Sequence, residues 1–268
     1  GDAAAVEPLR VNTANKFKGV KAGELDIALG MATWTFGRDA GLGINFPAVA
    51  FYDGQGFMTW RDAGLGRLTD LRGKTVCVQA GTTSQANLDD LNRREKLGLT
   101  PLHANSSEEK FTAFIRRQCD AVTGDRSELA ARRGAMDGMR DRWTNLPETI
   151  SREPLAPAVA DNDPQWADIV RWVIYALIIA EQKGVTSANI DHFDGPMDGE
   201  TRRLLGLEPG FGAPLGLDDQ WARRAVAQVG NYGEIFDRHL GPDSLVGLER
   251  GLNAPWSRGG LLYAPPLR

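Results

Sequence analysis

Short apolar runs alternate along the chain with longer segments whose apolar residues recur at helical spacing. The short runs predict strands at Val6–Leu9, Leu25–Leu29, Thr75–Gln79 and Asp120–Thr123. The longer segments predict helices at Thr13–Ala22, from Gly81 to about Lys96, from Ser107 onward, at Ser127–Arg133, at Pro164–Lys183 and at about Asp218–Gln228. Strands that alternate with helices indicate an α/β fold with a largely parallel sheet.

The remaining segments predict how these elements are connected. Thr33–Asn45 is rich in Gly and polar residues and is predicted to be a loop, whereas Phe46–Thr59 has the alternation of extended structure. Pro154–Val159 is extended between two Pro-containing stretches, which suits a crossover between two lobes. A chain of 268 residues is long for one core, so two lobes are expected.

Composition excludes several classes of protein. The chain is 42% hydrophobic and 25% charged with a net charge of −4, so nothing in it favours a nucleic-acid partner. The longest apolar run, Trp172–Ala180, is far shorter than the roughly 20 residues of a membrane span and predicts a buried helix. The chain opens on GDAAAVEPLR without an apolar leader, so we expect any signal peptide to have been removed.

The first polar cluster is TWTFGRDAG, which contains Thr33, Thr35 and Arg38. A guanidinium group presents two parallel donors to a carboxylate or phosphate, and neighbouring hydroxyls can complete such a contact. The alternative is a surface loop whose Arg38 pairs with Asp39 or a backbone carbonyl.

The second cluster, Gly81-Thr82-Thr83-Ser84, joins a predicted strand to a predicted helix. Free N–H groups and a partial positive charge make a helix N-terminus a binding place for anions. The sequence lacks the GxxxxGK[ST] and GxGxxG patterns of nucleotide loops. An ordinary turn that its own Thr or Ser caps is therefore the alternative.

The third cluster, VTGDRSEL, places Asp125 at the carboxyl end of a predicted strand, the end that faces the ligand crevice in open α/β sheets. A carboxylate there suits an ammonium group, and the alternative is an N-cap for the following helix. Taken together, Arg38 and the helix start near Thr83 complement a carboxylate, while Asp125 complements an ammonium. A free α-amino acid carries both groups on one carbon.

Catalytic and metal patterns are absent from the sequence. His103, His192 and His239 are scattered without zinc spacing, and neither GxSxG nor SxxK occurs, so we expect no metal, cofactor or nucleophile. Cys77 and Cys119 lack metal or CxxC spacing and could be one disulfide or two buried thiols.

Motifs along nearly the whole chain resemble one family, the periplasmic solute-binding proteins of polar and general L-amino-acid ABC transporters. The resemblance is to the branch that includes glutamate/glutamine/aspartate/asparagine binders. It is carried by AGELDIALGMATWTFGRDAGLGINF, FYDGQGFM, KTVCVQAGTTSQANL, QCDAVTGDRSELAARR, REPLAPAV, NYGEIFDRHLG, RGLNAPWSRGG and LLYAPPLR.

The resemblance implies a type II periplasmic-binding-protein fold, in which two α/β lobes joined by a two-strand hinge close on a ligand. It implies that Thr33 and Arg38 bind the ligand α-carboxylate, that Thr83 with Thr82 and Ser84 adds donors, and that Asp125 binds the α-ammonium. It also implies a Cys77–Cys119 disulfide formed in the oxidising periplasm and an ABC permease as partner. Lobe one is expected at residues 1–56 and 158–268, and lobe two at 57–157.

The sequence departs from the family at its start, since relatives carry a further strand, loop and helix before GDAAAVEPL. The chain could be a proteolysed piece of a longer protein or a naturally shortened one. A naturally shortened chain would expose apolar surface in lobe one, which a second copy could cover as a homodimer. Smaller departures are Met31, Ala32, Gly124 and Arg126. Two rival functions are a shortened interaction protein that dimerises without transport, and an enzyme resembling cyclohexadienyl dehydratases, which needs a proton-donating carboxyl in the cleft.

Overall fold

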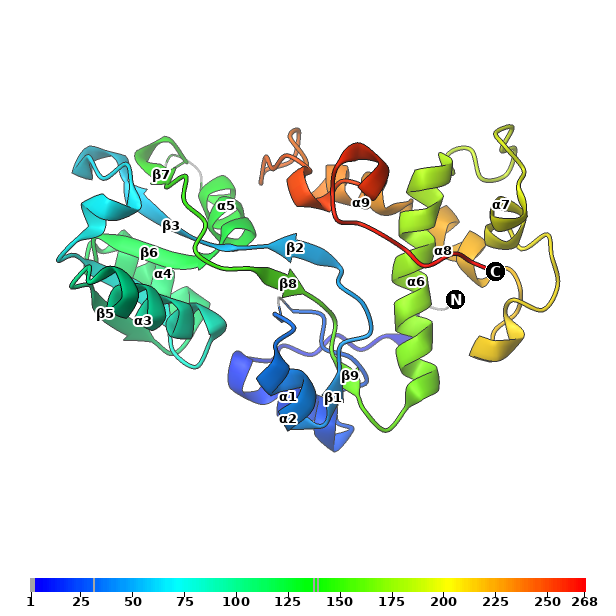
Figure 1. The fold of residues 1–268 in the computed structure, drawn as a ribbon, viewed down its shortest axis with the longest axis horizontal. Coiled ribbons are helices and arrows are strands. Elements are labelled where there is room, and N and C mark those ends of the chain that lie inside the picture. Colours follow the sequence, from blue (N-terminus) through cyan, green and yellow to red (C-terminus); the bar gives the residue numbers. More distant parts are fainter. Residues whose placement is uncertain (1–2, 31, 137, 139) are drawn as a thin grey trace.

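The computed structural model describes residues 3–30, 32–136, 138 and 140–268, which form two lobes joined by an antiparallel ribbon (Figure 1). Met31, one of the departures from the family, lies outside the described residues. The ribbon pairs β2 (Phe51–Asp53) with β8 (Glu153–Leu155), and Asp53 lies directly opposite Glu153. Its two strands run between the sheet of one lobe and the helices of the other, as expected of a two-strand hinge.

Lobe two is built on a five-stranded sheet with the strand order β5-β4-β6-β3-β7. The strands are β3 (Gln55–Trp60), β4 (Thr75–Gln79), β5 (Thr100–Ala104), β6 (Ala121–Asp125) and β7 (Trp143–Asn145). Strand β4 is parallel to β5 and β6, whereas β3 is antiparallel to β6 and β7. The sheet is therefore less uniformly parallel than the sequence predicted.

Helices cover both faces of this sheet. They are α3 (Thr83–Glu95), α4 (Ser107–Ile115) and α5 (Arg126–Ala135). Because side chains alternate along a strand, Val76 and Val78 pack with Leu88 of α3, while Cys77 between them packs with Phe114 of α4. The Cys77–Cys119 disulfide forms on the side of the sheet that α4 covers, so the predicted disulfide is confirmed.

Lobe one combines short strands with helices from both ends of the chain. Strands β1 (Ile44–Asn45) and β9 (Val159–Ala160) pair antiparallel beside α1 (Thr13–Ala22) and α2 (Phe36–Leu42). The remaining helices are α6 (Pro164–Lys183), α7 (Gly199–Leu204), α8 (Trp221–Val229) and α9 (Tyr232–His239). Single 3-10 turns lie at Ala3–Ala5, Arg61–Ala63, Leu68–Leu71, Arg140–Arg142, Ala213–Leu215, Gly251–Asn253 and Trp256–Arg258.

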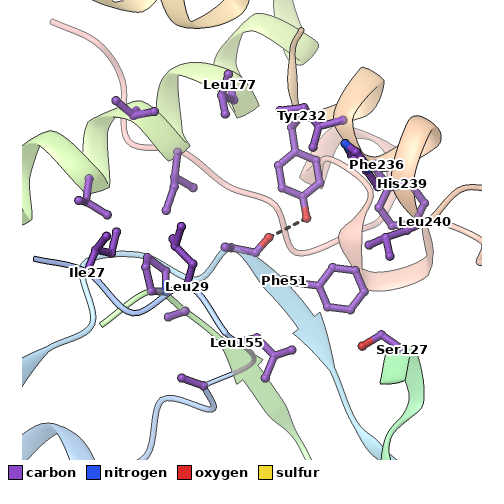
Figure 2. A pocket seen from close by; sticks show the side chains of 18 of the residues that line it. Ile27, Leu29, Phe51, Ser127, Leu155, Leu177, Tyr232, Phe236, His239 and Leu240 are labelled. Carbon is purple, nitrogen blue, oxygen red and sulfur yellow. Dashed lines mark hydrogen bonds between the residues drawn. The ribbon is translucent and has the colours of Figure 1, made fainter. Parts of the chain in front are cut away.

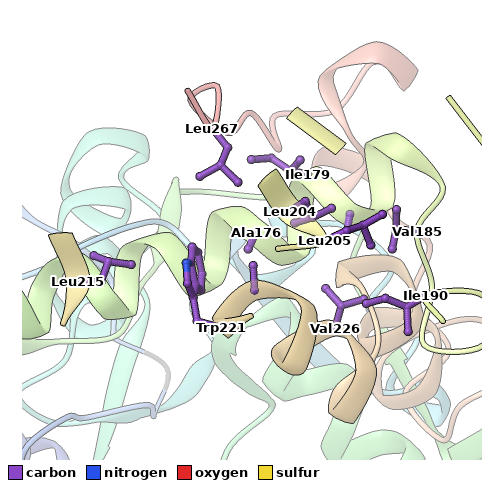
Figure 3. Close-up of a cluster of buried hydrophobic side chains, with 12 residues drawn as sticks. Ala176, Ile179, Val185, Ile190, Leu204, Leu205, Leu215, Trp221, Val226 and Leu267 are labelled. Atoms are coloured by element: carbon purple, nitrogen blue, oxygen red, sulfur yellow. The ribbon is translucent and has the colours of Figure 1, made fainter. Parts of the chain in front are cut away.

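The C-terminal region packs on α6 through one apolar cluster. Ile179 of α6, Leu204 of α7 and Trp221 of α8 are members of it, together with Leu267 near the end of the chain (Figure 3). The Gly- and Pro-rich region after Gly184 therefore has a core of its own, built on one side of α6.

Three predicted elements match the structure to the residue, namely Thr13–Ala22, Thr75–Gln79 and Pro164–Lys183. The strands predicted at Val6–Leu9 and Leu25–Leu29 do not form; the second retains only an isolated bridge between Ala28 and Ala158. A strand needs backbone pairing along its length; Val6–Leu9 has none, and Leu25–Leu29 has it only at Ala28.

The loop predicted at Thr33–Asn45 is also wrong, because it contains α2 and β1. Helix α2 begins where the Thr35 side chain accepts a hydrogen bond from Arg38 N, and it ends at Gly43 in the left-handed region, with φ of 68°. Helix α2 contains Arg38, so a helix and not a loop positions this predicted ligand contact.

Candidate ligand-binding site

Two side-chain contacts join the lobes beside the hinge, and we call the polar region around them the cleft. Thr33 Oγ1 of lobe one lies 3.4 Å from Thr83 Oγ1 of lobe two, and Gln79 Nε2 donates to Thr13 Oγ1 at 3.2 Å. Thr33 is only 4% exposed. Two of the predicted contacts, Thr33 and Thr83, are thus brought together from positions 50 residues apart in the chain.

Arg38 is positioned by its own lobe. Its Nη1 donates to the Thr33 carbonyl at 2.7 Å, and its guanidinium carbon lies 5.1 Å from the centroid of the Phe17 ring. Burial lowers the pKa of Arg38, and the nearby Glu153 and Asp125 carboxylates oppose that shift. The contact with the Thr33 carbonyl leaves other guanidinium nitrogens to donate to a carboxylate.

The three hydroxyl residues of the Gly81–Ser84 stretch have different environments. Thr82 is the N-cap of α3, because its Oγ1 accepts from Gln85 N at 3.3 Å and donates to Gln79 O at 2.8 Å. Thr83 faces Thr33 across the cleft, and Ser84 is buried with its carbonyl accepting from Gln55 Nε2 at 3.0 Å. The capping alternative is therefore realised by Thr82, at the same helix N-terminus that presents Thr83.

Asp125 is the last residue of β6 and is 9% exposed. Its side chain makes no cap bond to α5; instead Asp53 of β2 accepts from Ser127 N at 3.1 Å. Burial, followed by the Asp53, Glu153 and Glu128 carboxylates, raises the pKa of Asp125 to about 7, against the opposing charge of Lys110. A bound cation would cancel the repulsion and offset the cost of burying the charge.

Lys16 is a cleft residue that the sequence reasoning missed. It is 8% exposed on α1, and its Nζ donates to Gly30 O at 2.7 Å. Burial and the Arg38 charge lower the pKa of Lys16 to about 8, and Asp125 opposes that shift. Lys16 is four residues before the buried Val20, so a lysine on the apolar face of α1 was the available signal.

Glu153 was missed as well, although it lies within the REPLAPAV motif. It is 2% exposed on β8 and accepts hydrogen bonds from Thr33, Asn87 and Ser151. A charged residue at the start of an extended, Pro-containing run was the only sign of it in the sequence.

The charges of the cleft complement a zwitterion. Arg38 and Lys16 supply positive charge beside the N-terminus of α3, and the charge of Asp125 is within reach of both cations. Among the described residues, no group of three or more His, Cys, Asp or Glu side chains could hold a metal ion. Nor is any described helix long and apolar enough to cross a membrane.

A cavity of about 670 Å³ lies elsewhere, between α6, α9 and the hinge ribbon (Figure 2). Its walls are mostly apolar, with Ile27, Leu155 and Phe236 among the lining residues, and Leu29 on its wall is 76% exposed. An amino acid needs charged partners of both signs, and Glu128, which lines this cavity, is already paired with Lys110 at 2.8 Å. We therefore place the candidate ligand site in the polar cleft rather than in the cavity.

No model of a known protein family matches the chain. It is 42% identical over 269 residues to the glutamate/glutamine/aspartate/asparagine-binding protein BztA of Rhodobacter capsulatus. It is 41% identical over 270 residues to the general L-amino acid-binding periplasmic protein AapJ of Rhizobium johnstonii. Each match covers 100% of this chain and 79% of the relative.

A solved structure has the same arrangement. It is an ABC transporter periplasmic binding protein from Brucella ovis with glutathione bound, 40% identical, with a TM-score of 0.93 over 97% of this chain and 82% of that one. Relatives at this identity and coverage establish the family and the fold. The chain belongs to the family of periplasmic solute-binding proteins of amino-acid ABC transporters and has their type II two-lobed fold.

Proposed function

We propose that the protein captures an L-amino acid between its lobes and delivers it to an ABC permease from the periplasm. Arg38 and Thr33 bind the α-carboxylate from lobe one. Closure then adds Thr83, with Thr82 and Ser84 beside it, and Asp125 binds the α-ammonium. We assign lobe one to residues 1–56 and 158–268 and lobe two to 57–157.

The observation that carries this proposal is that the Asp125 carboxylate of lobe two lies near enough to Lys16 and Arg38 of lobe one to act on the pKa of both. The buried Asp125 carboxylate has a pKa raised to about 7, so it gains more than an exposed carboxylate would from an ammonium group. Arg38 stands close enough for its own pKa to respond to Asp125. The names of BztA and AapJ support an amino acid as ligand.

The second cation, Lys16, supports a ligand whose side chain carries an oxygen acceptor or a negative charge. BztA is named for glutamate, glutamine, aspartate and asparagine, which share a side-chain carbonyl or carboxylate. Glutathione, present in the Brucella structure, has the α-carboxylate and α-ammonium of an amino acid at its γ-glutamyl end. We therefore include γ-glutamyl compounds among the candidate ligands.

The test is calorimetric titration of protein that has been unfolded, dialysed and refolded, so that no amino acid remains from its production. The panel is L-glutamate, L-glutamine, L-aspartate, L-asparagine, L-leucine and glutathione, with D-glutamate as the stereochemical control. We expect micromolar or tighter binding, about −8 kcal/mol or stronger, for at least one L-ligand. A folded chain that binds none of them would refute the proposal.

We propose that the protein is not an enzyme, and the dehydratase rival has a direct test. Asp125, with its pKa near 7, supplies a cleft carboxyl of the kind that such an enzyme needs. Incubation with prephenate should give no turnover; phenylpyruvate formation that Asp125→Asn abolishes would favour the enzyme.

The apolar cavity supports the remaining rival, an interaction protein that forms a dimer. Exposed Leu29 beside the cavity offers the surface that a second copy would cover. Sedimentation velocity across micromolar concentrations decides it. A stable dimer that binds no amino acid would favour an interaction protein over a transport protein.

A further inference from the structure

Glu153 has no role in the ligand contacts proposed above, yet it is among the most buried charged residues of the cleft region. It is 2% exposed and lies on β8, one of the two hinge strands. A role for Glu153 in lobe closure rests on the proposed function, because the lobes would close on the amino acid proposed there.

The Glu153 carboxyl group is contacted from both lobes. Thr33 of lobe one donates its hydroxyl to Oε2 at 2.5 Å, and Asn87 of α3 in lobe two donates to Oε1 at 2.7 Å. Ser151, two residues earlier in the chain, also donates to Oε1, at 2.5 Å. One side chain of the hinge thus joins the carboxylate clamp of lobe one to a helix of lobe two.

The network continues into the ligand-facing parts of lobe two. Asn87 Nδ2 also donates to Gln55 Oε1 at 3.0 Å. Gln55 Nε2 in turn donates to Ser84 O at 3.0 Å and to Thr123 Oγ1 at 2.9 Å. Ser84 belongs to the loop that opens α3, and Thr123 lies two residues before Asp125 on β6, so the network reaches both lobe-two elements of the proposed site.

We propose that Glu153 is a positioning residue that couples closure of the hinge to assembly of the ligand clamp. A buried carboxyl group is stable only while donors surround it, and here the donors come from both lobes. Moving the lobes apart would remove donors from Glu153 and from Thr33 at once. Glu153 therefore favours the closed arrangement in which Thr33 meets Thr83, and a ligand that binds this arrangement gains affinity.

The test is Glu153→Gln, which keeps the shape of the side chain and replaces one acceptor oxygen by a donor. We expect it to weaken binding of the preferred amino acid by about 10- to 100-fold, because hydrogen bonds to charged groups have that effect. Stopped-flow measurements should place most of the loss in faster dissociation. Asn87→Ala, which removes only the donor from lobe two, is the second variant and should shift dissociation in the same direction.

Asp120→Asn is the matched control. Asp120 accepts a hydrogen bond from Thr75 N at 2.8 Å, wholly within lobe two and at the opposite end of β6 from Asp125. The control should lower thermal stability while leaving affinity within about twofold. Equal loss of affinity in Asp120→Asn and Glu153→Gln would reduce Glu153 to a general stabilising residue and overturn the proposal.

A double-mutant cycle with Thr33→Val tests the coupling itself. We expect the double variant to lose less affinity than the two single losses combined, because both changes break the hydrogen bond between Thr33 and Glu153. Strictly additive losses would show that Glu153 acts independently of Thr33 and would overturn the proposal.

Lobe closure without ligand separates this proposal from the proposed function. Fluorophores attached at Glu24→Cys and Arg93→Cys, exposed positions just after α1 and on α3, report the distance between lobes by energy transfer. Failure of the wild type to bind the panel would refute amino-acid capture. The distance between the lobes would then still test the role of Glu153 in closure. A longer mean distance between the lobes in Glu153→Gln supports the role of Glu153 in closure, and an unchanged distance overturns it.

Discussion

Lys16 and Arg38 hold their cationic groups over the same aromatic ring. The Lys16 ammonium lies 5.2 Å and the Arg38 guanidinium carbon 5.1 Å from the centroid of the Phe17 ring. The ring face stabilises both charges, and their mutual repulsion is one reason that the pKa of Lys16 falls to about 8. Two anionic groups, or one anion and the oxygen of an amide, would relieve that repulsion.

Arg38→Ala should weaken binding of every amino acid by about 100-fold, because truncation of a buried, hydrogen-bonded charge leaves its partner unpaired. Arg38→Lys should recover only part of this loss, since an ammonium group is a point charge and lacks the planar fork of a guanidinium. Calorimetry at physiological ionic strength measures both effects. Combined with Asp125→Ala, the Arg38→Ala change should abolish binding, and unchanged affinity in that double variant would disprove the clamp.

Lys16→Met should change selectivity more than affinity. We expect about a tenfold or larger loss for L-glutamate and a smaller loss for L-glutamine, because only the former offers a full negative charge to the ammonium. Lys18→Met, an exposed lysine on the same helix, is the matched control and should leave both affinities unchanged. An unaltered glutamate-to-glutamine ratio in Lys16→Met would remove Lys16 from ligand recognition.

The Cys77–Cys119 disulfide should stabilise lobe two without shaping the ligand site. It closes a loop with a sequence separation of 42, for which chain entropy predicts about 4 kcal/mol of stabilisation. Cys77 lies in the core with Phe114 and Trp143, away from the cleft. A Cys77→Ala, Cys119→Ala double variant should therefore unfold at lower temperature in calorimetry and retain its ligand affinity; equal thermal stability would contradict this account.

Local patterns in the sequence predicted elements that carry their own start and stop. Helix α6 is capped by Asp163, begins at Pro164 and ends before Gly184, and these signals are local. Strand β4 is a short apolar run buried on both sides, and its sequence alone predicts a strand. By contrast, Leu25–Leu29 looks like a strand but pairs with another segment only at Ala28, and no local pattern reveals how far such pairing extends.

The residues of the candidate site also fall into two groups, those that local motifs predict and those that they do not. The types and order of Thr33, Arg38, Thr83 and Asp125 were recognisable because each sits in a motif. Glu153 and Lys16 were not, because their importance arises from burial and from partners far away in the chain. Thr33 and Glu153, for example, are separated by 120 residues. Only the fold shows that a hinge strand and the segment before α2 meet beside Thr83.

Asp125 should make ligand affinity depend on pH. Its pKa is raised to about 7 in the ligand-free protein, and only the ionised carboxylate attracts an ammonium group. Binding therefore expels a proton below this pH, and affinity should fall by up to tenfold for each pH unit below about 7. For acidic ligands affinity should also fall above about pH 8, where Lys16 loses its charge. Calorimetry from pH 5 to 9 would show a maximum between these values, and a flat profile would contradict the assigned roles.

The same shift predicts that Asp125 destabilises the empty protein. Its folded pKa of about 7 lies above the ordinary value of 3.8, so folding binds a proton and the associated stability is present below pH 3.8. That stability is lost as pH rises through about 7, when a charge must be buried. Asp125→Asn should therefore raise the melting temperature of the ligand-free protein at pH 8 and have little effect near pH 4.

Asp125→Asn should also abolish the further rise in melting temperature that a saturating amino acid gives the wild type. Thermal unfolding by circular dichroism at both pH values, with and without L-glutamate, measures all of these. A lower melting temperature for ligand-free Asp125→Asn at pH 8 would show that Asp125 stabilises the fold, and it would contradict the proposed binding of an ammonium group by Asp125.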